Sequence, residues 1–169
     1  MKSFLIVVLS LVCSLCFSQS DVEPAKWSFD LNQVGPADYE LIFRADIEKP
    51  WVIYAQDVPE DGPIPTSITY TSDNIEVLEK ARESGDGKEE MDQMFEMTVK
   101  KFSHKEPYYL KQKIRLKDRS VPITGYVTYM SCNDEVCLPP RDVDFSFTIR
   151  VVNSLDAPKI NGGGSGNNH

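Results

Sequence analysis

The sequence predicts an all-β protein, an immunoglobulin-like antiparallel β-sandwich with a long charged loop. Three observations predict this fold class. Several short runs are rich in β-branched and aromatic residues, turn residues separate these runs, and residues 143–151 alternate apolar and polar side chains. About 150 residues follow an N-terminal apolar segment, a length that suits one domain with a single core. The antibody pattern of two distant cysteines flanking a tryptophan is absent from the sequence, so the sandwich is predicted by architecture only.

Residues 1–18 are predicted to be a signal peptide. Lys2 supplies a positive charge before the apolar run Phe4 to Cys16, and cleavage after Ser18 would place small residues at the −3 and −1 positions. The run is shorter than the roughly 20 apolar residues of a membrane-spanning helix. Cleavage would leave residues 19–26 as an N-terminal extension before the domain.

The signal does not have the pattern of a lipoprotein signal. Val12 and Leu15 precede its two cysteines, where a lipoprotein signal needs a small residue, so lipidation is disfavoured.

Signal removal changes the charge and the cysteine pairing. Removing Lys2 leaves 17 basic against 26 acidic residues, a net charge of −9, which disfavours binding to nucleic acid or anionic lipid. Because no long apolar segment follows, we expect a soluble protein in the periplasm, or otherwise exported, with no membrane span. Cys132 and Cys137 are then the remaining pair.

The predicted strands fall within residues 27–153, the predicted domain. They share short length and β-prone composition, and they are residues 39–47, 51–54, 67–70, 75–78, 108–116, 125–129 and 143–151.

Two segments do not read as strands. Residues 79–103 are the least regular, with a glycine-punctuated charged loop at 83–90 and a short helix at 88–97, which is rich in Glu, Met and Lys. Residues 154–169 are predicted to be a flexible tail, because they are rich in Gly and Asn.

The cysteine pair is the strongest chemical feature of the sequence. Cys132 and Cys137 have four residues between them. In an antiparallel hairpin with a four-residue loop they would lie directly opposite each other, about 4.5 or 5.5 Å apart at Cα, close to the roughly 4.4–6.8 Å that disulfides accept. A loop of about six residues gives only roughly 2 kcal/mol of stabilisation in the chain-entropy model. Spacing alone leaves open a structural clip or a redox-active disulfide.

The flanking residues favour an accessible disulfide. Pro139 and Pro140 cannot donate ladder hydrogen bonds, which predicts an edge or extended strand after Cys137. Asp134 and Glu135 would raise the pKa of a neighbouring thiol, with Arg141 as a counterweight. Such a thiol would react slowly with random disulfides and would need a partner to bring out its reactivity.

The chain resembles the N-terminal periplasmic domain of the thiol–disulfide interchange protein DsbD. The resemblance is carried by Gly125-Tyr126-Val127-Thr128-Tyr129-Met130-Ser131-Cys132, by Cys137-Leu138-Pro139-Pro140 and by the strand through Phe145-Ser146-Phe147. It extends over roughly residues 27–151 and includes the 51–54 segment, the loop at 92–95 and the strand at 109–116.

The resemblance implies an immunoglobulin-like fold whose cysteine pair shuttles between disulfide and dithiol. Electrons would arrive from a thioredoxin-like protein and leave to periplasmic acceptors such as disulfide isomerases and the thioredoxins of cytochrome c biogenesis. Cys137 would attack the acceptor disulfide and Cys132 would resolve the mixed disulfide, although the sequence itself does not distinguish the two roles. The exchange needs neither a metal ion nor an organic cofactor.

The family covers its cysteines with a cap loop that carries an aromatic residue. The matching stretch runs from Asp92 to Met97, and Phe95 is the candidate shield, which would exclude stray thiols until a partner displaces it. Alternatively, the apolar residues of this stretch simply pack into the core. Tyr54 and Tyr126 are further candidates for the surroundings of the site.

The sequence departs from the family in three respects. The cysteines have four residues between them, whereas the best-known family pattern has five. Glu96 stands where a glycine often follows the cap aromatic. The sequence contains neither the multi-spanning membrane domain nor the terminal thioredoxin domain. We therefore expect either a separate electron donor or a domain that has lost the pathway and kept the fold.

The alternative function is a non-catalytic exported β-sandwich interaction domain with a structural hairpin disulfide. A zinc site would need more ligands than Cys132, Cys137 and His104, and their spacing matches no closed four-ligand set. His104 is expected in a loop, and His169 lies in the predicted tail. The sequence does not predict the oligomeric state.

Overall fold

The computed structural model describes residues 22–149. The predicted signal peptide, the predicted tail with His169 and the end of the 143–151 strand lie outside these residues. The described part of the chain forms twelve β-strands and no helix, and all strand pairs are antiparallel. The predicted all-β, antiparallel fold class is therefore confirmed.

The first sheet has five strands in the order β1-β2-β9-β5, with β6 also paired to β9. Its strands are β1 (Ala25–Gln33), β2 (Asp38–Ile47), β5 (Ile75–Val77), β6 (Arg82–Ser84) and β9 (Tyr108–Leu116). Burial alternates strictly along β2, where Leu41, Phe43 and Ala45 are fully buried and the residues between them are partly exposed. One face of this sheet therefore supplies half of the main core.

The second sheet has three strands in the order β12-β10-β4, and it covers the apolar face of the first sheet. Its strands are β4 (Ser67–Tyr70), β10 (Ile123–Tyr129) and β12 (Arg141–Phe147). Phe43 of β2 meets Phe145 of β12 edge-on, with ring centroids 5.0 Å apart. Strand β12 follows Pro139 and Pro140 and lies at the end of its sheet, as the two prolines predict.

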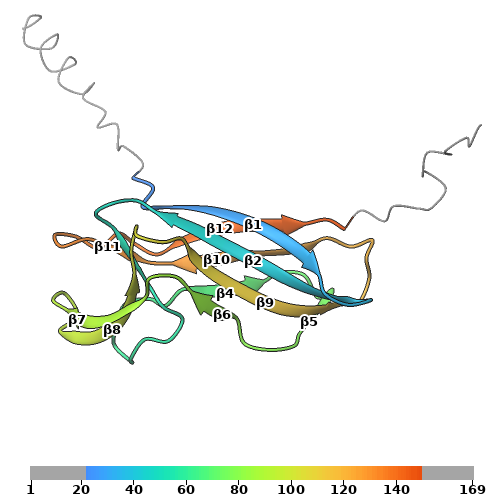
Figure 1. Ribbon diagram of the computed structural model, residues 1–169, viewed down its shortest axis with the longest axis horizontal. Helices are drawn as coiled ribbons and strands as arrows, with labels where there is room; N and C mark the ends of the chain where they lie inside the picture. The colour runs from blue at the N-terminus through green and yellow to red at the C-terminus, as the bar shows by residue number, and fades with distance from the viewer. Residues whose placement is uncertain (1–21, 150–169) are drawn as a thin grey trace, which may run out of the picture.

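The third sheet lies at one end of the sandwich, at the left of Figure 1. Its order is β11-β3-β8-β7, and its strands are β3 (Val52–Tyr54), β7 (Lys88–Asp92), β8 (Met97–Phe102) and β11 (Ser131–Cys132). Met130 alone separates β10 from β11, so the chain passes directly from the second sheet to the third. Ile53 and Phe102 of this sheet belong to the main core.

The prediction for residues 79–103 is wrong in two respects. The short helix expected at 88–97 does not form, because 88–92 is strand β7 and 97–102 is strand β8, joined by a four-residue turn at 93–96. The loop expected at 83–90 likewise contains the end of β6 and the start of β7. Helix propensity in this segment is overridden by cross-strand pairing.

Strand β1 was not among the predicted strands. It begins at Ala25, two residues before the expected start of the domain at Trp27, and pairs with β2 along its whole length. Its signal was present in the sequence, because Trp27, Phe29 and Leu31 alternate and all pack against the main core.

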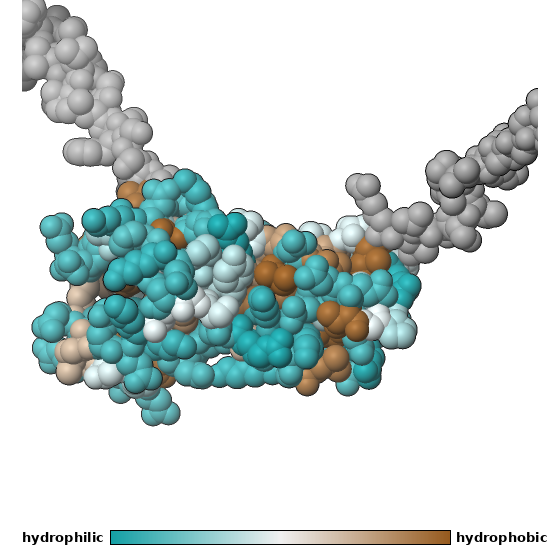
Figure 2. Space-filling view, viewed as in Figure 1, coloured by the Kyte–Doolittle hydropathy of each residue, from teal (hydrophilic) through white to brown (hydrophobic). Residues whose placement is uncertain are grey.

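The visible surface of the domain is mainly polar (Figure 2), and the full sequence has a net charge of −8. Figure 2 shows a mostly hydrophilic face on which hydrophobic residues form small, separate patches. Across residues 22–149, the structure has no apolar helix of membrane-spanning length.

Candidate functional site

The candidate site is built on a tight hairpin that carries the cysteine pair. Cys132 on β11 pairs with Val52 of β3, and Cys137 lies directly opposite Cys132 in an isolated antiparallel bridge. The Asn133 N–H donates to the Val136 carbonyl at 3.0 Å, and the Asn133 Oδ1 accepts from the Val136 N–H at 2.8 Å. Asparagine favours this turn position because its side chain bonds the backbone nearby. The predicted disulfide is present, with the two Cα atoms 4.1 Å apart.

The two cysteines differ in their exposure. Cys132 is only 3% exposed, whereas Cys137 is half-buried. Cys132 belongs to a second, smaller cluster of buried residues with Tyr54 and Val99, which we call the small apolar cluster. Residues packed against this cluster are Val52, Val58, Phe95, Met97, Met130 and Cys137. An incoming thiolate therefore reaches the Cys137 sulfur more easily than the Cys132 sulfur, and access helps decide which sulfur is attacked.

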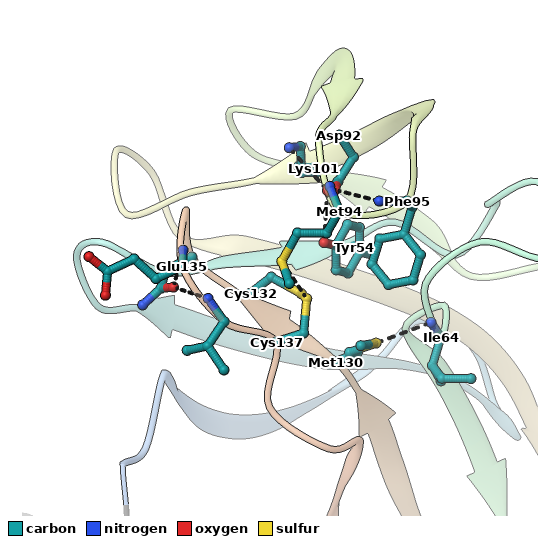
Figure 3. The surroundings of a disulfide bond; sticks show 12 residues. Tyr54, Ile64, Asp92, Met94, Phe95, Lys101, Met130, Cys132, Glu135 and Cys137 are labelled. Carbon is teal, nitrogen blue, oxygen red and sulfur yellow. Dashed lines mark hydrogen bonds and ion pairs between the residues drawn. A yellow bond between two sulfur atoms is a disulfide. The ribbon is translucent and has the colours of Figure 1, made fainter.

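A turn from the third sheet lies over the disulfide. This turn, residues 93–96 between β7 and β8, is called the cap turn. Its Met94 points down to the disulfide, and the Met94 Sδ lies 3.4 Å from the Cys137 Sγ (Figure 3). Because a disulfide sulfur carries no proton, this is a sulfur–sulfur packing contact. Met94 thus covers the more exposed of the two cysteine sulfurs.

Asp92 holds the cap turn in place. Its Oδ1 accepts hydrogen bonds from the backbone N–H groups of Met94 at 2.9 Å and Phe95 at 3.3 Å. Aspartate at the start of a turn commonly makes such side-chain to backbone bonds, and they order the turn from within. Glu96 ends the turn with a φ of 51°, in the left-handed region that glycine favours. The backbone shape that a glycine would supply is therefore adopted by a glutamate.

The other oxygen of Asp92 connects the cap turn to the floor of the site. The buried Tyr54 hydroxyl donates to Asp92 Oδ2 at 2.9 Å, and the Lys101 ammonium lies 3.3 Å from the same oxygen. Burial opposes ionisation of Asp92. The Tyr54 hydroxyl, the Met94 and Phe95 amides and Lys101 nevertheless hold the pKa of Asp92 below its ordinary value. Burial and the neighbouring Asp92 carboxylate raise the pKa of Tyr54, so its hydroxyl stays protonated.

Phe95 lies beside Tyr54, whereas Met94 lies against the Cys137 sulfur. The two rings meet edge-on, with centroids 6.0 Å apart and planes at 84° (Figure 3). Phe95 packs against the small apolar cluster. Its ring therefore has apolar surroundings, which agrees in part with the alternative that this stretch packs into the core. Phe95 supports the cap turn from the side, and Met94 touches the sulfur.

A groove of ≈ 350 Å³ runs beside the disulfide. Its lining includes Val52, Met91, Gln93, Met94, Cys132 and Asn133. Asp92 and Lys101 also line it, so a chain segment bound there would meet paired charges next to apolar side chains.

The structure brings Tyr54, Asp92 and Phe95 together around the disulfide, but not Tyr126. Tyr126 lies on β10 between Gly125 and Val127, whose side of the strand faces the main core, so its own side chain points to the opposite face. Its cross-strand partners are Thr69 and Asp144 of the second sheet. His104 is exposed in the turn between β8 and β9, as expected.

Two residues of the site were missed by the sequence reasoning. Met94 is one of the apolar residues of the 92–97 stretch, for which the sequence offers only core packing, although it directly precedes the expected shield Phe95. Lys101 is not predicted by the sequence, because a lysine in a charged segment gives no sign that its side chain is only 14% exposed. The sequence contains no separate signal for either contact, since both depend on how β7 pairs with β8.

Comparisons with known proteins find similarity in structure only. No protein-family model and no curated protein matches the sequence. The N-terminal periplasmic domain of ScsB from Proteus mirabilis matches with a TM-score of 0.55 and 14% identity, over 76% of this chain and 47% of that chain. The N-terminal domain of Neisseria meningitidis DsbD in its reduced form matches with a TM-score of 0.48 and 19% identity, over 74% of this chain and 86% of that chain.

A DsbD N-terminal domain is thus among the structural neighbours, as the sequence resemblance predicts. The chain spans about half the length of the ScsB chain that it matches. The likeness to ScsB, at low sequence identity, concerns the fold: this chain has the fold of the N-terminal periplasmic domain of ScsB.

Proposed function

We propose that this protein is an exported thiol–disulfide exchange domain that relays electrons through Cys132 and Cys137 between thioredoxin-like proteins. The observation that carries the proposal is the asymmetry of the disulfide. The half-buried Cys137 sulfur is bonded to a buried Cys132 and touches the half-exposed Met94 of a separate turn. A partner thiol needs only to displace that turn to reach a sulfur atom.

The proposed exchange passes two electrons in two steps. In the reduced protein, the Cys137 thiolate attacks one sulfur of an acceptor disulfide, and the other acceptor sulfur leaves as a thiolate. The Cys132 thiolate then attacks Cys137 in the mixed disulfide, which forms the Cys132–Cys137 bond and releases the second acceptor thiolate. The two protons lost by the cysteines match the two that the acceptor thiolates take up. A donor dithiol reduces the pair again by the reverse sequence.

The hairpin has backbone hydrogen bonds of its own beside the disulfide, which supports exchange over a structural clip. The Leu138 N–H donates to the Ser131 carbonyl at 2.9 Å, and the Asn133 N–H donates to the Val136 carbonyl at 3.0 Å. These bonds close the hairpin on both sides of the cysteines. Because the disulfide closes a loop of only about six residues, it adds roughly 2 kcal/mol in the chain-entropy model.

In this proposal the cap turn gates the reaction. Met94 shields Cys137, Phe95 supports the turn against Tyr54, and Asp92 fixes the turn through its two backbone hydrogen bonds. Such a turn would exclude small thiols and open when a partner docks. The shielding role expected for Phe95 is thus reassigned to Met94.

The reduction potential of the pair tests the function. Equilibration in glutathione and dithiothreitol buffers should give a value above about −250 mV, which suits a relay, whereas a value below about −300 mV would assign a structural disulfide.

Single cysteine variants test the order of attack. Cys132→Ala retains the half-buried Cys137 and should trap a mixed disulfide with a thioredoxin-like protein. Cys137→Ala retains only the buried Cys132 and should trap far less. Equal trapping by the two variants would remove the assigned order.

A further inference from the structure

We propose that the reduced cysteine pair and Met94 together form a binding site for a monovalent copper ion, because the fold gathers thioether and cysteine sulfurs at one place. The described residues contain four methionines, and all four lie around the cysteine pair. Met94 contacts Cys137, Met97 and Met130 pack against the small apolar cluster, and Met91 lines the groove beside Cys132.

Three sulfur atoms lie in a row, with the Cys137 sulfur in the middle. The Met94 Sδ is 3.4 Å from the Cys137 Sγ, which is bonded to the Cys132 Sγ (Figure 3). The three atoms come from three segments: Cys132 from β11, Cys137 from the end of the hairpin, and Met94 from the cap turn. Thiolate and thioether ligands are soft and select Cu(I) over the harder divalent ions.

The binding step is balanced as follows. A dithiol or phosphine reductant supplies two electrons, and two protons are taken up, so that the disulfide becomes two thiols. Cu(I) then replaces both thiol protons, which are released to solvent, and the Met94 thioether donates a lone pair. The complex of two thiolates and one Cu(I) carries one negative charge. The disulfide form has no thiolate and should not bind the ion.

The surroundings favour a soft ion of low coordination number. Among residues 22–149 there is no group of three or more His, Cys, Asp or Glu residues placed to hold a metal, whereas Zn²⁺ takes four ligands in its structural sites. Asp92 is already engaged by Tyr54 and Lys101. Tyr54, Val99 and Cys132 are almost fully buried, so water reaches the sulfur atoms only from the side of the groove.

Copper binding would compete with exchange. Both thiolates would be coordinated, so neither could attack a disulfide until the ion left. The same cap turn would then serve two ligands: displaced by a protein partner, and closed over the ion through Met94.

The test is a titration of the reduced protein with Cu(I) held by a coloured chelator, under anaerobic conditions after reduction by a phosphine. We expect one Cu(I) per protein and no competition by the oxidised protein. Met94→Leu keeps the apolar cover and removes the sulfur, so it should weaken Cu(I) binding by at least about tenfold. Met130→Leu is the matched control. The Met130 Sδ accepts the Ile64 N–H at 3.4 Å and points toward Ile64 in Figure 3, so this variant should bind as the parent does.

An unchanged affinity in Met94→Leu would overturn the proposal, and so would equal binding by the oxidised protein. X-ray absorption on the unmodified protein gives an independent count of ligands. Three sulfurs support the site, and two sulfurs overturn the role of Met94. A phosphine reduces the pair whatever its potential, so this result stands apart from the relay function. Copper binding without a trapped partner would fail the relay alone.

Discussion

Asp92 connects three parts of the site through one carboxylate. Its Oδ1 fixes the cap turn, and its Oδ2 meets the Tyr54 hydroxyl and the Lys101 ammonium. Because Asp92 is only 4% exposed, little water is available to replace its carboxylate as a partner for the surrounding groups.

Replacing Asp92 by Asn should lower the free energy of unfolding at neutral pH by about 1–3 kcal/mol. The buried Tyr54 hydroxyl loses its charged acceptor, and Lys101 keeps only Glu90 as an ion-pair partner. The pKa of Asp92 is lowered in the folded state. Its contribution is therefore complete above the unfolded pKa of about 3.9 and is lost as the pH falls through the folded pKa. Urea denaturation of both proteins should show the gap closing below about pH 4. A gap that stays constant would mean that the Asp92 charge is not responsible.

Met94→Ala should speed the reduction of the disulfide by dithiothreitol several-fold, because the Cys137 sulfur loses its cover. Phe95→Ala removes the ring packed on Tyr54, so it should lower the free energy of unfolding. It should accelerate reduction of the disulfide less than Met94→Ala does. Stopped-flow measurement of both variants separates shield from support. A larger acceleration in Phe95→Ala would restore the ring as the shield.

At the residue scale, the sequence predicted the disulfide because the two cysteines are so close in the chain. Tyr54, Asp92 and Phe95 were located through the family resemblance. The contact of Met94 with Cys137 could not be predicted, because it depends on how β7 pairs with β8. The turn between these strands also contains a left-handed backbone at Glu96, which glutamate rarely adopts.

The β7–β8 hairpin is the element that carries the cap, and its first strand has no apolar alternation. Residues 88–91 of β7 are exposed, and only Asp92 is buried. The strand exists because it pairs with β8, whose Val99 and Phe102 are buried. Composition therefore predicted loop and helix here, and only the partner strand decides otherwise.

Glu96→Gly should not destabilise the hairpin. A non-glycine residue in the left-handed region costs roughly 1–2 kcal/mol, which offsets the roughly 0.5–1 kcal/mol that glycine loses in backbone entropy. Glu89→Gly is the matched control, because Glu89 is an exposed position within β7. It should lower the free energy of unfolding by about 0.5–1 kcal/mol in urea denaturation. An equal loss in both variants would show that Glu96 is not strained.

At the scale of the whole molecule, the site and the main core are separate clusters. The main core lies between the first two sheets, whereas Cys132, Tyr54 and Val99 form the small apolar cluster. Alternation along β2, β9 and β10 made the sandwich predictable. The third sheet was predictable only at β3, which lies in the predicted 51–54 strand, because β7, β8 and β11 are short or charged.

Reducing the disulfide should leave the sandwich folded and lower its free energy of unfolding by roughly 2 kcal/mol, because the closed loop has only about six residues. Urea denaturation with and without a phosphine reductant measures this difference, and far-UV circular dichroism checks that the folded baseline is unchanged. Unfolding on reduction would assign the disulfide to structure.

The passage of the chain from β10 to β11 has a consequence for motion. Tyr129 is anchored in the main core, and three residues later Cys132 lies in the small apolar cluster. Amide protons of β7 and β8 should therefore exchange with solvent through local openings, while those of β2 and β9 exchange only when the whole sandwich opens. The third sheet should open locally while the sandwich stays closed, and the cysteine hairpin lies at the boundary between these two parts.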